Sequence, residues 1–304
     1  MSVVAERKCF AKPFLKWAGG KGQLIDEIDA RLPKKEIETG EIETYVEPFV
    51  GGGAVFFHIA QKYQQIERFY LLDINEDLVN CYNAVKNDVA SIVRRLRRLE
   101  KRFLRLEEDD RKKLYYEIRE KFNDTRNVAY LIFLNKACYN GLYRVNRKNE
   151  FNAPFGYYLN PRICDGENLR EVSSVLQKAD IRVGDFTQSA AYIDQGALVY
   201  LDPPYRPISQ TASFTAYSKD SFSEGDQIRL SEFCGRISAK GARFLLSNSD
   251  PKNEDPRDNF FETHYPASLG FDIDTVTASR VINCKGSGRG QIRELIITNY
   301  RVDD

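Results

Sequence analysis

An acidic residue, two prolines and a tyrosine follow one of the most apolar stretches of the sequence. Residues 197–201 are all apolar, as in a strand buried on both faces of a sheet, and Asp202-Pro203-Pro204-Tyr205 comes directly after them. The exocyclic amine of a nucleobase is a poor nucleophile because its lone pair is delocalised into the ring. A carboxylate and a backbone carbonyl that accept its two protons would free this lone pair to attack a methyl group, and a tyrosine ring could stack on the base. The alternative is a proline-rich turn with a capping aspartate.

A glycine-rich turn follows an earlier predicted strand. Phe49 precedes Gly51-Gly52-Gly53, and the next predicted strand reaches Asp73, twenty residues after the last glycine. Glycines at a strand-to-helix turn let the backbone approach a ligand closely, and a carboxylate at this spacing can accept hydrogen bonds from both ribose hydroxyls. The pattern indicates a nucleoside site. The alternative is a tight turn followed by a capping aspartate.

A third segment, residues 14–21, contains Trp17 and Lys21 together with two glycines ahead of a predicted helix. A carboxylate or another anion could bind at the N-terminus of such a helix. Trp17 could equally be a core aromatic, so this segment is informative only in combination with the other two.

The elements that must position these segments alternate along the chain. Seven apolar or β-branched runs predict strands, at 44–49, 69–74, 180–186, 197–201, 242–247, 271–280 and 294–300. Helical spacing fits 52–64 and 225–240 between them. We therefore predict an α/β fold with a Rossmann-like, doubly wound sheet. The last two runs predict a C-terminal antiparallel hairpin with a glycine-rich tip at 283–290.

A long helical segment separates the second and third predicted strands. Helical patterns are predicted at 89–106, 112–122 and 127–138. Residues 76–180 contain 21 Lys+Arg and 16 Asp+Glu, whereas the rest of the chain contains 24 and 28. We therefore predict a catalytic domain formed by 1–75 and 179–304 and an inserted helical domain, 76–178, that binds a polyanion. The alternative is a set of solvated helix faces.

The composition excludes several classes of protein. Hydrophobic residues make up 42% and charged residues 29%, as in globular proteins, and no apolar run is long enough to span a bilayer. Six cysteines without a close pair and only two histidines predict reduced thiols, a cytoplasmic location and no metal site.

In their order along the chain, the three segments resemble the Dam-type DNA adenine methyltransferases, in which the cofactor motif comes first and the catalytic motif last. The resemblance extends to 134–146, 150–158, 214–217 and Phe222. It implies S-adenosyl-L-methionine as methyl donor, S-adenosylhomocysteine as product and double-stranded DNA as partner. It also implies a bacterial or phage-encoded protein that acts at the nucleoid, and it leaves open a pairing with a restriction endonuclease.

The resemblance assigns three groups of residues and makes the helical insert the target recognition domain. The implied catalytic residues are Asp202, Pro203, Pro204 and Tyr205. The implied cofactor contacts are Trp17, Lys21, Phe49, Gly51, Gly53, Asp73, Asp185, Phe186 and Asp202. The implied DNA contacts are Tyr139, Asn140 and Arg144. Arg144 falls where the family reads guanine within GATC, and arginine is the natural bidentate partner of guanine. The alternative for Arg144 is a phosphate contact.

Two other functions stay open from the sequence. A cytosine-N4 methyltransferase would use the same chemistry at the amine, although Asp202 in place of serine favours adenine. A nonenzymatic DNA-binding module on the same fold would need neither Asp202 nor the glycine turn.

Overall fold

In the computed structural model, the described residues are 10–206, 222–279 and 291–302. By its internal contacts the chain divides into two compact units. The first contains the described residues up to Gly20, Gly51–Lys62 and Asn75–Ile181. The second contains Lys21–Val50, Tyr63–Ile74 and the described residues from Arg182 onward. The first unit thus combines the long helical segment with two segments that come earlier in the sequence.

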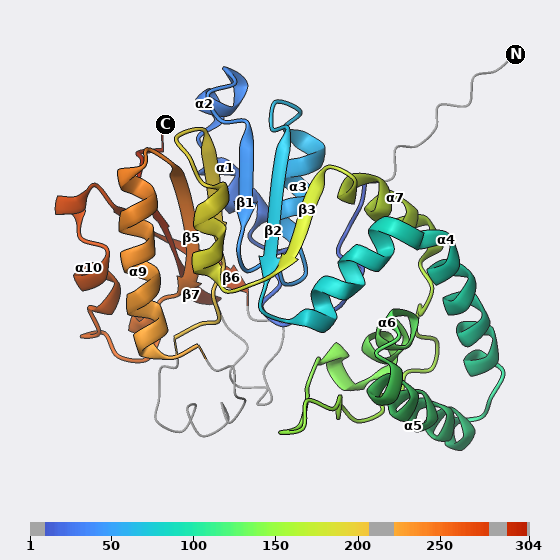
Figure 1. Ribbon diagram of the computed structural model, residues 1–304. Coiled ribbons are helices and arrows are strands. Elements are labelled where there is room, and N and C mark those ends of the chain that lie inside the picture. Colours follow the sequence, from blue (N-terminus) through green and yellow to red (C-terminus); the bar gives the residue numbers. More distant parts are fainter. Residues whose placement is uncertain (1–9, 207–221, 280–290, 303–304) are drawn as a thin grey trace, which may run out of the picture. The chain divides into compact units, whose positions relative to one another are not determined.

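A seven-stranded sheet has the strand order β3-β2-β1-β4-β5-β7-β6 (Figure 1). The strands are β1 (Thr44–Glu47), β2 (Arg68–Asp73), β3 (Ala179–Val183), β4 (Ala197–Leu201), β5 (Arg243–Ser249), β6 (Asp272–Ser279) and β7 (Gln291–Thr298). Strand β1 pairs in parallel with β2 and β4, and β4 pairs in parallel with β5. Strand β7 is antiparallel to both β5 and β6. This order confirms the predicted Rossmann-like α/β fold and its C-terminal hairpin. The predicted tip at 283–290 lies outside the described residues.

All five residues of strand β4 are buried, as are all four residues of the neighbouring β1. Val199 and Leu201 join a hydrophobic cluster with Leu230 and Phe233 of helix α9 (Glu224–Ala239), which lies across the sheet in Figure 1. The residues between them on the strand face the opposite side and are buried as well. A strand covered on both faces offers polar chemistry only where it ends, and the carboxyl end of β4 is followed by Asp202.

Helices and short 3-10 turns connect the strands. Their bounds are α1 (Ile25–Ala30), α2 (Lys34–Glu38), α3 (Ala54–Lys62), α4 (Glu76–Leu104), α5 (Glu108–Thr125), α6 (Val128–Ala137), η1 (Tyr139–Gly141), α7 (Gly166–Leu176), η2 (Phe186–Tyr192), η3 (Pro251–Asn253), α10 (Phe260–His264) and η4 (Ala267–Leu269). In the first unit, α4 packs against α6 and α7, and α5 packs against α6.

Two of the element boundaries that differ from the sequence prediction have a clear physical reason. Helix α4 begins at Glu76 rather than 89, because the side chain of Asn75 caps it by accepting a hydrogen bond from the Leu78 amide at 3.0 Å. The helix is broken at Asp88 (φ −146°, ψ 56°), so the predicted start matches only its second half. Strand β3 ends at Val183 rather than 186, because Asp185 caps the 3-10 turn η2. Helix α1 is the helix predicted to follow residues 14–21, whereas the short helix α2 and helix α7 were not predicted.

The glycine turn supplies a test of local stability within the first unit. Gly53 has φ +71°, and a Cβ added there would lie 2.6 Å from the phenol oxygen of Tyr82, which itself donates a hydrogen bond to the Gly51 carbonyl. We expect Gly53→Ala to lower the free energy of unfolding by more than about 1–2 kcal/mol, the cost of a left-handed backbone alone. Urea unfolding would measure it.

Gly40→Ala is the matched control, since Gly40 has φ +78° and nothing lies within 4 Å of a Cβ added there. Adding Tyr82→Phe to Gly53→Ala should recover part of the loss, because the nearest remaining atom of the Tyr82 ring is 3.5 Å away. If Gly40→Ala and Gly53→Ala lowered the free energy of unfolding equally, the contact with Tyr82 would be unimportant.

Candidate active site

The acidic motif lies at the carboxyl end of β4, between β1 and β5 in the sheet. The strand order reverses between β1 and β4, and open α/β sheets bind their ligands at such a switch point. Strand β1 ends at the same edge with Glu47, whose buried carboxylate accepts a hydrogen bond from the phenol of Tyr45 at 2.8 Å. Both central strands therefore deliver a carboxylate to this edge.

Asp202 is paired with Lys21 within the second unit. The ammonium Nζ of Lys21 lies 2.5 Å from Oδ1 of Asp202, and the two side chains are 4% and 18% exposed. Burial raises the pKa of the Asp202 carboxyl to about 6, because loss of water outweighs the ammonium of Lys21, and nearby Glu294 raises it further. Lys21, predicted as a cofactor contact, is thus in direct contact with the predicted catalytic carboxylate.

Tyr205 is fixed at both ends of its ring. Its hydroxyl donates a hydrogen bond to Oε2 of Glu294 at 2.9 Å, and the ammonium of Lys21 lies 4.8 Å from the ring centroid. Burial, with the carboxylates of Asp202 and Glu294, raises the pKa of the phenol well above its usual value, so it stays a neutral donor. Glu294 was not predicted; its signal in the sequence is a single carboxylate directly before the apolar run of β7.

The second proline of the motif is held by a buried amide chain. The carbonyl of Pro204 accepts a hydrogen bond from Nε2 of Gln227 at 2.9 Å, and Oε1 of Gln227 accepts one from Asn248 at 3.3 Å. Both amide side chains are buried. The Pro204 carbonyl therefore already has one donor within the protein, and the turn after Pro203 is tied to α9.

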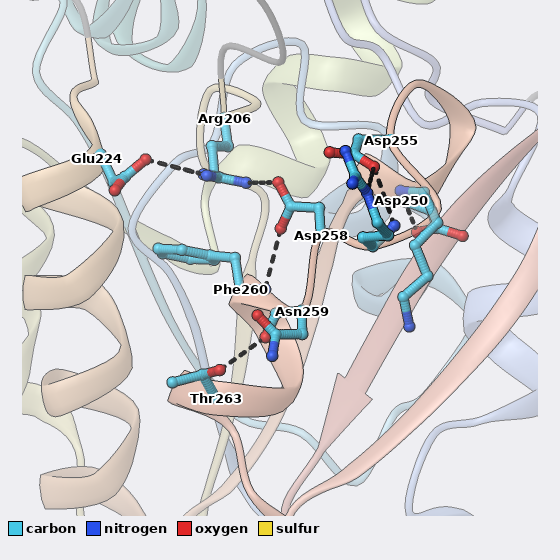
Figure 2. A network of polar contacts seen from close by, with 10 residues as sticks. Arg206, Glu224, Asp250, Asp255, Asp258, Asn259, Phe260 and Thr263 are labelled. Atoms are coloured by element: carbon cyan, nitrogen blue, oxygen red, sulfur yellow. Dashed lines mark hydrogen bonds and ion pairs between the residues drawn. The ribbon is translucent and has the colours of Figure 1, made fainter.

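The residue after the motif, Arg206, is anchored by three neighbours (Figure 2). Its guanidinium lies 2.5 Å from Asp258 and 3.0 Å from Glu224, the first residue of α9. It also lies 4.4 Å from the ring centroid of Phe260. Figure 2 shows Asp258 continuing into the start of α10, where it accepts a hydrogen bond from the Phe260 amide. This network fixes the chain as it leaves the motif.

The other predicted cofactor contacts of the second unit lie at strand ends. Asp73 ends β2, and its carbonyl accepts a hydrogen bond from the Gly184 amide at 3.0 Å. The ring of Phe49 stacks on that of Phe186 with centroids 5.5 Å apart, and Phe222 closes the cluster. Asp185 is engaged locally, because it caps η2 and forms an ion pair with Arg229 at 2.9 Å.

The first unit holds the remaining predicted cofactor contacts. Trp17 stacks on Tyr143 with ring centroids 5.1 Å apart, and a Cβ on Gly52 would lie 3.5 Å from the Trp17 side chain. Gly51 and Gly53 both have positive φ angles, so the turn adopts a backbone that favours glycine. The glycine turn and Trp17 are therefore neighbours.

The predicted DNA contacts lie in the first unit, after α6. Tyr139 and Asn140 are exposed on η1, and Asn140 is in the left-handed region at φ 54°. Arg144 is exposed, and Asn152 holds its guanidinium twice, through Oδ1 at 2.7 Å and the backbone carbonyl at 2.9 Å. These bonds use Nε and Nη2 and orient the arginine before any ligand binds. The family positions 214–217 lie outside the described residues.

Within the described part of the chain, no group of three or more His, Cys, Asp or Glu side chains is arranged to hold a metal ion. No described helix is long and apolar enough to cross a membrane.

Known proteins give the family of this chain. Residues 17–282 match the D12 class of N6 adenine-specific DNA methyltransferases. The chain is 49% identical over 297 residues to the "Type II methyltransferase M.MjaIII" of Methanocaldococcus jannaschii, covering 95% of this chain and 99% of the relative. It is 34% identical over 292 residues to a "DNA adenine methylase" of Vibrio cholerae, covering 94% and 95%. It is 38% identical over 243 residues to the "DNA adenine methylase" of Escherichia coli, covering 79% and 81%.

The chain therefore belongs to the D12 class N6 adenine-specific DNA methyltransferase family. This confirms the resemblance drawn from the three segments and identifies the protein as an adenine-specific DNA methyltransferase.

The raised pKa of Asp202 gives a prediction that needs no substrate. We expect its carboxyl carbon to titrate near pH 6 in an NMR experiment on the folded protein, above the value of about 3.9 for a free aspartate. Asp202→Asn would identify the signal. In Lys21→Met the midpoint should rise, because the ammonium favours the ionised carboxylate. A midpoint near the free value, or no change in Lys21→Met, would contradict the geometry.

Proposed function

We propose that this protein transfers a methyl group from S-adenosyl-L-methionine to the exocyclic N6 amine of an adenine in double-stranded DNA. The observation that carries the proposal is the buried Lys21–Asp202 pair at the carboxyl end of β4, beside the tethered ring of Tyr205. Family membership gives the substrate class, and this pair is the group at the sheet's switch point that is suited to the chemistry.

The residues present suit the methyl donor. Asp73 at the end of β2 offers a carboxylate to ribose hydroxyls, and Gly51 and Gly53 form a turn whose backbone a ligand can approach. Phe49 and Phe186 are the aromatic donor contacts proposed in the second unit, and Trp17 is the one proposed in the first unit. S-adenosylmethionine would supply a sulfonium methyl group, whose C–S bond breaks as the C–N bond forms, leaving neutral S-adenosylhomocysteine.

Asp202 and Pro203 would act on the amine. The carboxylate of Asp202 and the carbonyl of Pro203 each accept one N–H of the amine, which draws the nitrogen out of conjugation and frees its lone pair. The methylated nitrogen must then lose one proton, and Asp202 is the nearest base. A pKa of about 6 makes this carboxylate a better proton acceptor than an ordinary aspartate while it stays largely ionised at neutral pH.

Tyr205 would hold the target base outside the duplex. A base inside the stack cannot reach Asp202, so enzymes that act on bases extrude them into a pocket and stack them on aromatic rings. The hydrogen bond to Glu294 and the ammonium of Lys21 fix the Tyr205 ring before a base arrives. Stacking of this kind contributes about 1–3 kcal/mol per base.

Arg144 is the proposed reader of guanine, within a target that we propose to be GATC. Asn152 engages Nε–H and one N–H of Nη2, so the second N–H of Nη2 and the neighbouring Nη1 remain as a fork of donors for a base edge. The helical region 76–178 would be the target recognition domain, with Tyr139 and Asn140 beside the space that the extruded base leaves. The similarity to a type II methyltransferase supports a pairing with a restriction endonuclease, and a cytoplasmic site of action follows from the DNA substrate.

Transfer of a labelled methyl group from S-adenosylmethionine to unmethylated plasmid DNA tests the function. We expect N6-methyladenine as the labelled nucleoside, and a loss of at least about 100-fold in rate for Asp202→Asn, which keeps the shape but removes the charge of the acceptor. Label on N4-methylcytosine, or near-normal turnover by the variant, would refute the proposal.

Arg144→Ala tests the proposed specificity. A bidentate contact favours guanine over another base by about 1–3 kcal/mol. The variant should therefore methylate GATC more slowly, and the difference in rate between GATC and sites with another base in place of the guanine should become smaller. The salt dependence of binding should barely change. Rates on GATC and on single-base variants at two salt concentrations would measure this.

Arg147→Ala is the matched control, because Arg147 is exposed three residues further along the same segment. If Arg144→Ala lowered the methylation rate equally on all sequences and reduced the salt dependence of DNA binding, Arg144 would be a contact to the phosphate backbone instead.

A further inference from the structure

The second half of α4 carries an unusual density of positive charge. Seven basic side chains lie between residues 94 and 105, and all are exposed: Arg94, Arg95, Arg97, Arg98, Lys101, Arg102 and Arg105. The only acidic residue in that stretch is Glu100, and its carboxylate is occupied by the amides of Ile163 and Cys164 at 2.9 and 3.0 Å. We call these seven residues the α4 basic face.

The α4 basic face lies opposite the buried side of the helix. Ile92, Val93, Leu96 and Phe103 are the buried residues of this half of α4. At about 100° per residue, the seven cations fall within an arc of about 160°, and the buried residues are centred on the opposite side. The charges are therefore gathered on one continuous surface of the first unit.

This charge is little compensated by the protein itself. Arg102 forms an ion pair with Glu117 at 3.2 Å, and Arg97 lies beside Gly166. Over the residues that the structure describes, none of the other six cations forms an ion pair. Like charges three or four residues apart destabilise a helix by about 0.2–0.5 kcal/mol per pair. Arg94 and Arg98, and Lys101 and Arg105, are such pairs.

Helix α5 shows what an ordinary solvated charged face looks like in the same unit. There, Lys113 pairs with Asp110 at 2.9 Å and Lys121 pairs with Glu117 at 2.6 Å. Opposite charges alternate along α5 and stabilise it, whereas α4 concentrates one sign. Exposure to solvent therefore explains the charges on α5, but it does not explain why α4 concentrates charges of one sign.

We propose that the α4 basic face binds the phosphate backbone of duplex DNA outside the bases that are read, which rests on the proposed function. From residue 94 to 105 the helix extends about 16 Å, the rise of about five base pairs. Seven charges over that length give about one per 2.4 Å, close to the one per 1.7 Å of duplex DNA. Bound phosphates would also relieve the repulsion within the helix. The surface adds sequence-independent affinity and holds the enzyme on the duplex between target sites.

The test replaces the four cations at the centre of the arc together, as Arg94→Gln, Arg98→Gln, Lys101→Gln and Arg105→Gln. A matched control replaces four cations that each have an acidic partner, namely Lys113, Lys121, Lys252 and Arg257. Dissociation constants are measured over a range of salt concentrations on two DNA molecules. One is a long duplex of random sequence, and the other is a short duplex that contains one target site and ends close to it.

We expect the α4 variant to bind the long duplex at least about tenfold more weakly at physiological salt. The slope of log K against log salt should be smaller by about 0.9 for each phosphate that the variant no longer neutralises. The loss should be smaller on the short duplex, and the rate at saturating DNA should be unchanged. The melting temperature should not fall, because the substitutions remove repulsion. This result excludes misfolding as the cause of weaker binding.

Affinity and slope equal to those of the control variant would overturn the proposal and leave the α4 basic face to an acidic protein partner. Failure of the proposed function is separate. It would appear as no methylated adenine with the unaltered protein, while the difference in DNA affinity between the two variants could still be measured.

Discussion

The active-site region depends on one buried ion pair between residues that are 181 positions apart. Lys21 lies at the start of the second unit's sequence and Asp202 follows its central strand, so the pair forms only when β4 is in place. Removing one partner of a buried pair leaves an uncompensated charge and typically destabilises by about 3–5 kcal/mol. The pair has a second effect, because the ammonium of Lys21 also faces the ring of Tyr205. One cation thus lowers the pKa of the carboxylate against the larger effect of burial, and it also faces the aromatic ring.

The motif supplies few backbone hydrogen bonds of its own. Two prolines lack amide donors, so the turn after β4 cannot be tied down by its own ladder of backbone hydrogen bonds. Side chains from elsewhere replace them: Gln227 binds the Pro204 carbonyl, Glu294 binds the Tyr205 hydroxyl and Glu224 binds Arg206. These partners come from α9 and β7, which are far apart in sequence. The turn is held in one geometry before substrate arrives, as precise positioning of reacting groups requires.

The sequence predicted the strands and the acidic motif well because both have local signals. The apolar run of 197–201 and the tetrapeptide after it are read directly from neighbouring residues. Glu294 and Gln227 could not be found in this way, because their importance comes from a contact across the sheet and a single Glu or Gln has no distinctive pattern. The break in α4 at Asp88 was also missed, since aspartate is common inside helices and only the backbone angles reveal it. Capping by Asn75 and Asp185 moved two predicted boundaries for a related reason: short polar side chains decide where elements end.

The position of β7 in the sheet has a consequence for how the protein is made. Strand β7 lies between β5 and β6, and it carries Glu294, the hydrogen-bond partner of Tyr205. A ribosome synthesises β7 after both of these neighbours, so the β6–β7 hairpin can join the open edge of β5 only once β7 has been made. A nascent chain can therefore fold its parallel strands and pair Lys21 with Asp202 while Tyr205 is still without its carboxylate partner. The order of synthesis thus allows the ion pair to form before the aromatic ring beside it is tethered.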